Sequence, residues 1–356
     1  MTTLVPTPDA IPAAWEYFHF LLMLLFPLHL LLMNAMVGTT VIAAYALLKK
    51  RETMTGLAYE LAKVLPFLIA FAVNLGVGAL LFLQLLYGQF FYTGSILMGV
   101  YWLAVVPLLL LAYYSAYLFD FKFTSINTLM KIFLICLPLA IFLVIAFIYT
   151  NNMTMMLDPE AWQAYFKNQQ GTVLHWGHTP LIPRYLHFMT GGIAVGGLFV
   201  ALLGRVRKRM DPAVRAAAER IGMGVFTVLT GAQILVGFLF LAVLPRPLLH
   251  LFMGDDILAT TVFAVALILA LLVLVAGTLR KVWLCVGLVV PLVYLMTFIR
   301  DIVRTGYLRP YFTLESLPVV PQYGPMFLFL FALLAGLATI AWLVWKAVSS
   351  LRERRI

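Results

Sequence analysis

The sequence has little charge and almost no cysteine. Only 11% of its 356 residues are charged, while 64% are hydrophobic, and 24 basic side chains stand against 14 acidic ones. The two cysteines, Cys136 and Cys285, both fall inside long apolar runs and belong to no CxxCH motif. These shortages exclude a disulfide framework, a thiolate metal site and covalent cofactor attachment through a CxxCH motif.

Nine long apolar runs make up most of the chain. They reach or exceed the ~20 residues that a helix needs to cross a bilayer, and the mean hydropathy is +1.03. The pattern predicts an all-α, polytopic membrane helical bundle of about nine transmembrane helices rather than a soluble domain. Residues 1–356 then form a single transmembrane domain with outer loops at 150–181 and 301–324. The runs cover roughly residues 16–48, 64–87, 96–119, 128–150, 182–204, 221–244, 257–279, 282–302 and 325–346.

The basic residues are divided unevenly between the two ends of these helices. Most of them lie in alternate connecting segments, at 49–63, 122–131, 205–220, 280–281 and 346–355. The positive-inside rule therefore predicts an outer N-terminus and a cytoplasmic C-terminus in a bacterial or archaeal inner membrane. The net charge of +10 then faces anionic lipid and requires no nucleic-acid partner.

Acidic side chains are missing from the middle of every apolar run. The third run, 97–119, carries Trp102, Tyr113 and Tyr117 but no Asp or Glu. A protein that moves cytoplasmic protons through the membrane usually needs carboxylate relays, although water chains could substitute. The absence argues against proton translocation.

One apolar run begins with a proline, an arginine and a histidine. In the stretch 183–202, glycines follow His187 after four, five, nine and ten residues. A neutral imidazole can ligate haem iron, glycines let a flat macrocycle lie close to the backbone, and Arg184 can pair with a propionate. We predict that His187 holds a haem b. Close helix packing through Gly191 and Gly197 is the alternative.

All six histidines fall in the outer half of this topology. Histidine inside a membrane is costly unless it is paired or liganded, so His19 and His29 in the first run are further ligand candidates. Ten residues, or ~15 Å of helix, separate them, so they cannot bind one iron. A structural histidine bonded to a neighbouring helix is the alternative for His29. Exposed loop histidines are the simpler explanation for His175 and His178.

A second axial ligand and partners for the haem propionates must come from other outer segments. Met253 has a suitable depth for an axial ligand, and His250 competes for the same role. Arg300, Arg304 and Arg309 can make bidentate contacts with propionates or a quinone headgroup. Snorkelling of these arginines at the interface is the alternative.

The outer loop 150–181 is rich in methionine, and its Asp158-Pro159-Glu160 sequence favours a short helix. Loops of this length usually have a function. We expect it to form a docking surface.

Several segments share their order with a known family. Residues 26–30 with His29, residues 74–78, His187 with its glycines, and residues 306–311 follow one another along the chain. In this order they resemble subunit I of the cytochrome bd quinol oxidases. The resemblance implies nine spans and an outer N-terminus. It also implies that His29 ligates a haem of the oxygen-reducing pair and that His187 ligates the haem b nearest the quinol site.

Two features of that family have no counterpart here. Its long outer quinol-binding loop between spans 6 and 7 is replaced by the short segment 245–256. Its third helix carries glutamates, one of them a haem ligand, whereas 97–119 carries none. The resemblance therefore extends to two haem histidines but not to the oxygen-reducing centre.

Together these features predict a haem b-containing electron-transfer subunit of a respiratory complex. It would pass electrons between membrane quinol and an outer-face redox partner such as a cytochrome c. It would contain two or more haems. It would also assemble with a second membrane subunit or with another copy of itself. A bd-type oxygen-reducing quinol oxidase subunit is the first alternative. A haem-free transporter or channel is the second, but the inverted repeats with broken helices that would mark it are not found.

Overall fold

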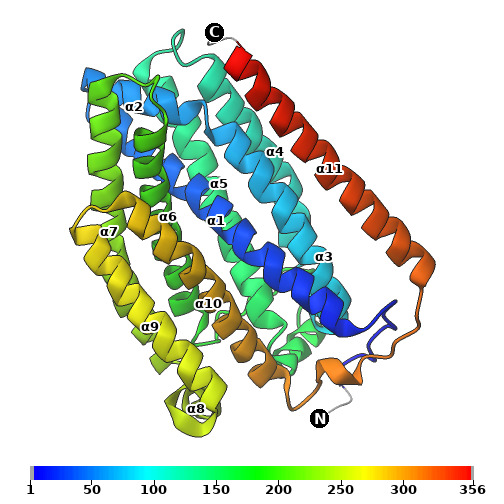
Figure 1. Cartoon of the computed structure of the whole chain (residues 1–356). Helices are drawn as coiled ribbons and strands as arrows, with labels where there is room; N and C mark the ends of the chain where they lie inside the picture. Colours follow the sequence, from blue (N-terminus) through cyan, green and yellow to red (C-terminus); the bar gives the residue numbers. More distant parts are fainter. Residues whose placement is uncertain (1–3, 354–356) are drawn as a thin grey trace.

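The computed structural model describes residues 4–353, and within that range it contains helices, turns and loops but no strand. Nine of its helices are long and apolar enough to cross a membrane, which confirms the predicted all-α bundle (Figure 1). The long helices are α1 (Trp15–Leu48), α2 (Glu52–Ala62) continuing into α3 (Leu65–Leu97), α4 (Gly99–Phe121), α5 (Thr128–Met155), α6 (Leu181–Val206), α7 (Pro212–Ala242), α9 (Ile257–Thr278), α10 (Val282–Leu308) and α11 (Tyr323–Glu353). The short ones are η2 (Pro159–Phe166), α8 (Arg246–His250), η3 (Leu251–Asp255) and η4 (Leu314–Ser316).

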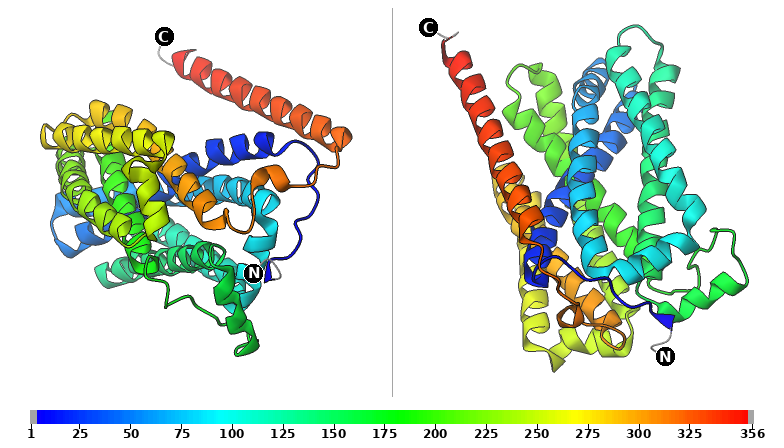
Figure 2. Two further views of the ribbon diagram at one scale, coloured as in Figure 1. Left: turned by 90° about the horizontal axis from the view of Figure 1, so that it is seen from below. Right: turned by 90° about the vertical axis from the view of Figure 1, so that its right-hand side faces the viewer.

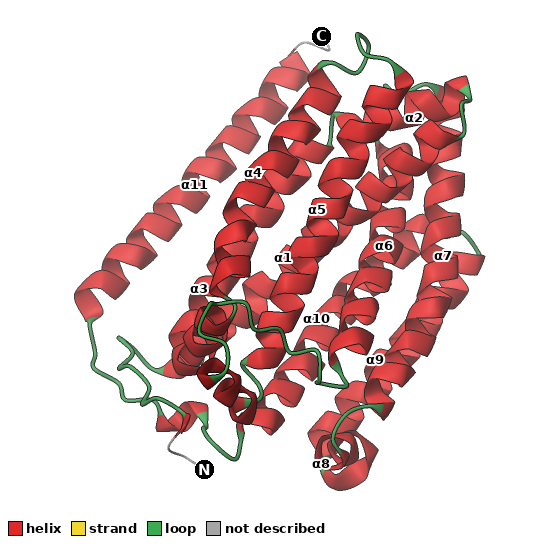
Figure 3. Cartoon of the chain, turned by 180° about the vertical axis from the view of Figure 1, so that it is seen from behind, coloured by secondary structure: helices red, strands yellow, loops and turns green. Residues whose placement is uncertain are grey.

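Helix α1 runs through the middle of the bundle. It packs against α3 on one side and α6 on the other, while α4 pairs with α5, α6 with α7, and α9 with α10 (Figure 3). The crossing of α1 and α6 is close because glycines meet there. A Cβ on Gly196 would lie 2.6 Å from the carbonyl oxygen of Asn34 on α1. Glycines also meet where α6 packs against α7, and there a Cβ on Gly197 would lie 2.8 Å from the carbonyl oxygen of Gly222. Small residues at these contacts let the backbones approach, as is common in membrane bundles.

Helix α11 stands apart from the other helices (Figure 2). Its side chains are exposed along almost the whole described length, although its hydropathy is that of a membrane span. It therefore faces lipid or another protein on all sides. Arg354 and Arg355, which contribute to the basic C-terminal segment, lie outside the described residues.

The two ends of the bundle differ in their connections. We call the end that holds the N-terminus the N-side and the opposite end the C-side (Figure 1). The N-side carries η2, α8, η3 and η4, whereas the helices on the C-side are joined by short turns. The short helix predicted at Asp158 is η2, and the Asp158 side chain caps it by accepting from the Ala161 amide at 3.4 Å.

The predicted loop boundaries were wrong at two places. Helix α10 continues to Leu308, so Asp301 and Arg304 lie on a helix rather than in a loop. The helix continues because Val303 and Leu308 are buried against its neighbours. Helix α5 likewise continues to Met155, so the first six residues of the segment expected to be a loop are helical.

Candidate functional site

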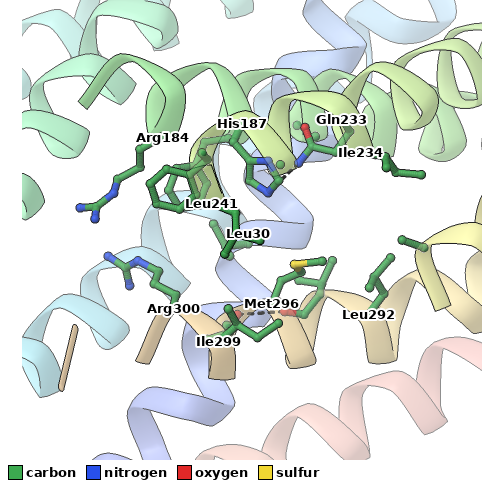
Figure 4. Close-up of a pocket in the computed structure, with 18 of the residues that line it drawn as sticks. Leu30, Arg184, His187, Gln233, Ile234, Leu241, Leu292, Met296, Ile299 and Arg300 are labelled. Atoms are coloured by element: carbon green, nitrogen blue, oxygen red, sulfur yellow. Dashed lines mark hydrogen bonds between the residues drawn. The ribbon is translucent and has the colours of Figure 1, made fainter. Parts of the chain in front are cut away.

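An apolar cavity of ≈ 280 Å³ lies among α6, α7, α9 and α10, and residues of α1 and of the end of α5 also line it (Figure 4). Aliphatic and aromatic side chains form most of its wall, including Ile234, Leu241 and Leu292. A concave apolar site with a few convergent polar groups is the usual form of a ligand or cofactor pocket. The polar residues in the wall are Asn34, Arg184, His187, Thr230, Gln233, Thr297, Arg300 and Arg304.

His187 enters the cavity from the second turn of α6. Its Nε2 pairs with the side-chain amide of Gln233 on α7 at 3.0 Å, while its buried Nδ1 has no hydrogen-bond partner among residues 4–353. The ring fits because Gly237 faces it: a Cβ there would lie 3.1 Å from the imidazole Cε1. Leaving a buried nitrogen unpaired costs ~1–3 kcal/mol, a cost that a ligand to the ring would remove.

The glycines that follow His187 divide into two groups. Gly191 and Gly192 line the cavity, next to the side chains of Gln233 and Asn34 respectively. At Gly196 and Gly197, the backbones of α1 and α7 respectively occupy the space that a side chain would need. The alternative of close helix packing therefore holds for Gly197, and only the first two glycines border the cavity.

Three arginines gather at the N-side of the cavity. Arg184 from α6 and Arg300 from α10 extend toward the same end of it in Figure 4, and Arg304 lines the wall one turn further along α10. Arg304 forms an ion pair with Asp301, yet its Nε and Nη1 have no partner. Among residues 4–353, Arg184 and Arg300 have no carboxylate partner. Arg184 donates to Thr154 Oγ1 at 3.3 Å, and Arg300 lies over the ring of Phe26 at 4.5 Å.

Uncompensated guanidinium groups at a low-dielectric wall are costly unless an anion pairs with them. The end of the cavity that carries these arginines therefore suits the carboxylates of an amphipathic cofactor. A planar guanidinium can donate two parallel hydrogen bonds to one carboxylate. The donor set therefore combines an imidazole in an apolar space with cations at one end.

The wall opposite His187 carries Met296 of α10 (Figure 4). The two residues expected to supply a second axial ligand lie elsewhere. Met253 and His250 do not line the cavity, and their side chains are more than half exposed, with His250 Nδ1 3.8 Å from Asp255 Oδ2. They are held away because α8 and η3 form a separate turn beyond the end of α7.

His19 and His29 lie outside this cavity and both have protein partners. His19 Nε2 lies 2.8 Å from Asp301 Oδ2, which joins it to Arg304. His29 Nδ1 lies 2.8 Å from the carbonyl oxygen of Ala72, and its ring fills the space above Gly76 on α3. The structural alternative for His29, a bond to a neighbouring helix, is thus present in the molecule. Its role as a haem ligand stays a prediction.

The remaining predicted residues lie on the N-side, outside the cavity. Arg309 follows the end of α10 and is exposed, away from the cavity. His175 and His178 approach Asp158, whose Oδ2 lies 3.3 Å and 3.9 Å from them. Burial lowers the pKa of His178 to about 4, and the hydrogen bond from His175 lowers the pKa of Asp158. Their approach makes them a cluster rather than separate loop histidines.

Two cavity residues were not predicted from the sequence. Gln233 is the only amide in the apolar run 221–244, and an isolated polar side chain in a span is a functional signal that could have identified it. Met296 is one of 16 methionines and carries no such signal. Only the packing of α10 against α6 and α9 brings it to the cavity.

No protein-family model matches this sequence, and no curated protein matches it. Among solved structures, the fold is similar to that of the bd oxidase from Geobacillus thermodenitrificans. The match has a TM-score of 0.69 and covers 92% of this chain and 96% of that chain, with 14% sequence identity. At this identity the similarity concerns the fold alone.

Proposed function

We propose that the chain is a haem b-containing electron-transfer subunit of a respiratory complex. It exchanges electrons between membrane quinol and a redox partner, such as a cytochrome c, that docks on the N-side. The observation that carries the proposal is the buried imidazole of His187, which faces an apolar cavity with one ring nitrogen unpartnered. The fold, which is similar to that of a bd oxidase, supports the same reading.

The residues around the cavity fit a haem b in three respects. His187 offers an imidazole and Met296 a thioether from opposite walls, and these are common axial ligands of electron-transfer haems. Arg184 and Arg300 offer cations for the two propionates. Most of the rest of the wall is aliphatic or aromatic, which suits the apolar faces of a porphyrin.

The protein has separate tasks in this proposal. When bound, the haem supplies reversible one-electron chemistry. Gln233 holds the imidazole of His187 in one orientation through its 3.0 Å hydrogen bond. Arg184 and Arg300 would hold the propionate end and would favour the reduced state through their positive charge, while the aliphatic wall lowers the local dielectric.

The partners follow from where the site lies. His187 and the arginines are close to the N-side, which the basic C-side loops predict to be the outer face. A cofactor there is within reach of an outer redox protein. The exposed length of α11 suits a second membrane subunit or another copy of the chain.

A difference spectrum of the purified protein tests the proposal. The dithionite-reduced minus oxidised spectrum is expected to show b-type bands, and reduced quinol should produce the same bands without dithionite. Extraction is expected to yield protohaem. Protein that contains quinone or lipid but no protohaem would refute the haem assignment, and haem that dithionite reduces but quinol does not would refute the quinol link.

A further inference from the structure

We propose that Asp158, His175 and His178 form a binding site for a divalent cation, Zn²⁺ in particular. Each residue offers one ligand atom, and these atoms all lie within 4.8 Å of one another. In a tetrahedral zinc site with bonds of about 2.1 Å, neighbouring ligand atoms are about 3.4 Å apart. The separations of 3.3 Å from His175 to Asp158 and 3.9 Å from His178 to Asp158 are close to that value. Small side-chain rotations suffice to bring the three ligands around one ion.

An ion pair alone does not account for the cluster. The 3.9 Å separation between His178 Nδ1 and Asp158 Oδ2 is too long for a hydrogen bond. The other ring nitrogen of His178, Nε2, is buried without any hydrogen-bond partner. The rings of His175 and His178 are 4.9 Å apart and nearly perpendicular, so neither satisfies the other. A cation among the three side chains would be bound by Nδ1, the ring nitrogen of His178 that faces Asp158, and would give that nitrogen a partner that the described residues do not supply.

The backbone holds the three ligands in place before any ion binds. Asp158 is fixed as the cap of η2. The His175 amide donates to the buried side chain of Asn151 at 3.1 Å, and the His178 amide donates to the His175 carbonyl at 3.2 Å. The two imidazoles therefore sit on one tight turn facing the carboxylate. Such preorganisation lowers the entropic cost of assembling a site.

Access and ligand type select the class of ion. The Asp158 side chain is 32% exposed and that of His178 is 13% exposed, so an ion can enter from solvent and keep a water as a fourth ligand. Two imidazoles and one carboxylate suit Zn²⁺ and its neighbours in the first transition row, whereas Ca²⁺ and Mg²⁺ prefer oxygen ligands. A bound ion would tie η2 to the turn that precedes α6. The site is separate from the haem cavity and does not depend on the haem assignment.

Metal binding by the full-length protein, stripped with a chelator and kept in detergent, tests the site. Competition with a chromophoric chelator is expected to reveal one Zn²⁺ bound tightly by the wild type. The double variant His175→Gln/His178→Gln should weaken that binding by at least about 100-fold. His250→Gln is the matched control, because His250 faces only Asp255 at an exposed N-side position. This variant should bind Zn²⁺ with the same affinity as the wild type.

A second variant guards against misfolding. Asp158→Asn removes the charged ligand but keeps a good helix cap, so it should fold and still lose affinity. Co²⁺ should give visible d–d bands in the wild type and none in this variant. Equal Zn²⁺ affinity in the wild type and Asp158→Asn would overturn the proposal, and so would an equal loss in His250→Gln. The haem content of the same samples, measured by its absorption, should be unchanged.

Discussion

Two regions of this bundle contain histidines inside membrane spans, and they treat them differently. In the region of α6, α7, α9 and α10, His187 faces a cavity and one of its ring nitrogens is unpaired. In the region of α1, α3 and the end of α10, His19 is joined to Asp301, and His29 is bonded to the Ala72 carbonyl against Gly76. The first region contains a cavity that can hold a ligand, whereas in the second region protein groups already bond to the imidazoles.

A histidine in a span can therefore find its hydrogen-bond partner within the protein, as His19 and His29 do. What distinguishes the two regions is whether the protein already satisfies the imidazole and whether apolar space lies beside it. By that criterion, we revise the two or more haems predicted from the sequence: we now expect one haem, at His187, and no oxygen-reducing pair at His29.

The largest effect is expected from removing the two histidines in turn. His187→Ala should eliminate haem b from the purified protein, because no other side chain in the cavity offers an imidazole. His29→Ala should leave the haem content unchanged, since its ring contacts α3 rather than the cavity. Pyridine haemochrome spectra normalised to protein give both values. Loss of haem in the His29 variant would break the distinction between the two regions.

The next largest effect concerns the second axial ligand. Met296→Leu should convert the haem to a form with one protein ligand and lower its reduction potential by on the order of 100 mV, because a thioether ligand favours the reduced iron. A redox titration with parallel EPR detects both changes. Met253→Leu is the control and should match the wild type, since Met253 is exposed outside the cavity. A shift in the Met253 variant alone would transfer the role to that residue.

The contact between the two regions gives an intermediate effect. Gly196→Ala should destabilise the bundle by about 1–3 kcal/mol, because a Cβ there overlaps the backbone of α1. Gly224→Ala on α7 has open space around it and should be neutral or slightly stabilising. Thermal unfolding in detergent compares the two. Equal unfolding midpoint temperatures for the Gly196→Ala and Gly224→Ala variants would mean that α1 and α6 do not pack as closely as described.

The smallest effect is expected from the propionate end. Arg300→Gln should lower the haem potential by about 60 mV or less, which corresponds to a tenfold change in a one-electron equilibrium, because one positive charge near the haem is lost. Arg205→Gln removes a charge at the far end of α6, where Arg205 pairs with Glu219, and should leave the potential unchanged. An equal shift in both variants would show that the arginines act only through net charge.

Much of the fold was predictable from the sequence, and less of the site. Nine hydrophobic runs long enough to cross a bilayer are a strong signal, because lipid demands helices with satisfied backbones. His187 and Arg184 could be identified together because they lie three residues apart at the head of one helix. The hydrogen bond between His19 and Asp301 could not be predicted, since the two residues are 282 positions apart and meet only when α10 packs beside α1. Met296 was missed for the same reason.

Helix lengths were another limit of the sequence. The polar residues Asp301 and Arg304 suggested that α10 had ended, yet the helix continues through them, and the two side chains pair with each other across one turn. A polar pair with i,i+3 spacing is compatible with helix, whereas hydropathy alone treats it as a boundary.

A density map of the purified protein tests the central claim most directly. We expect a single macrocycle between α6 and α10, with its iron bound by His187 on one side and Met296 on the other and its propionates against Arg184 and Arg300. A macrocycle between α1 and α3 at His29, with lipid or quinone in the cavity beside His187, would contradict it.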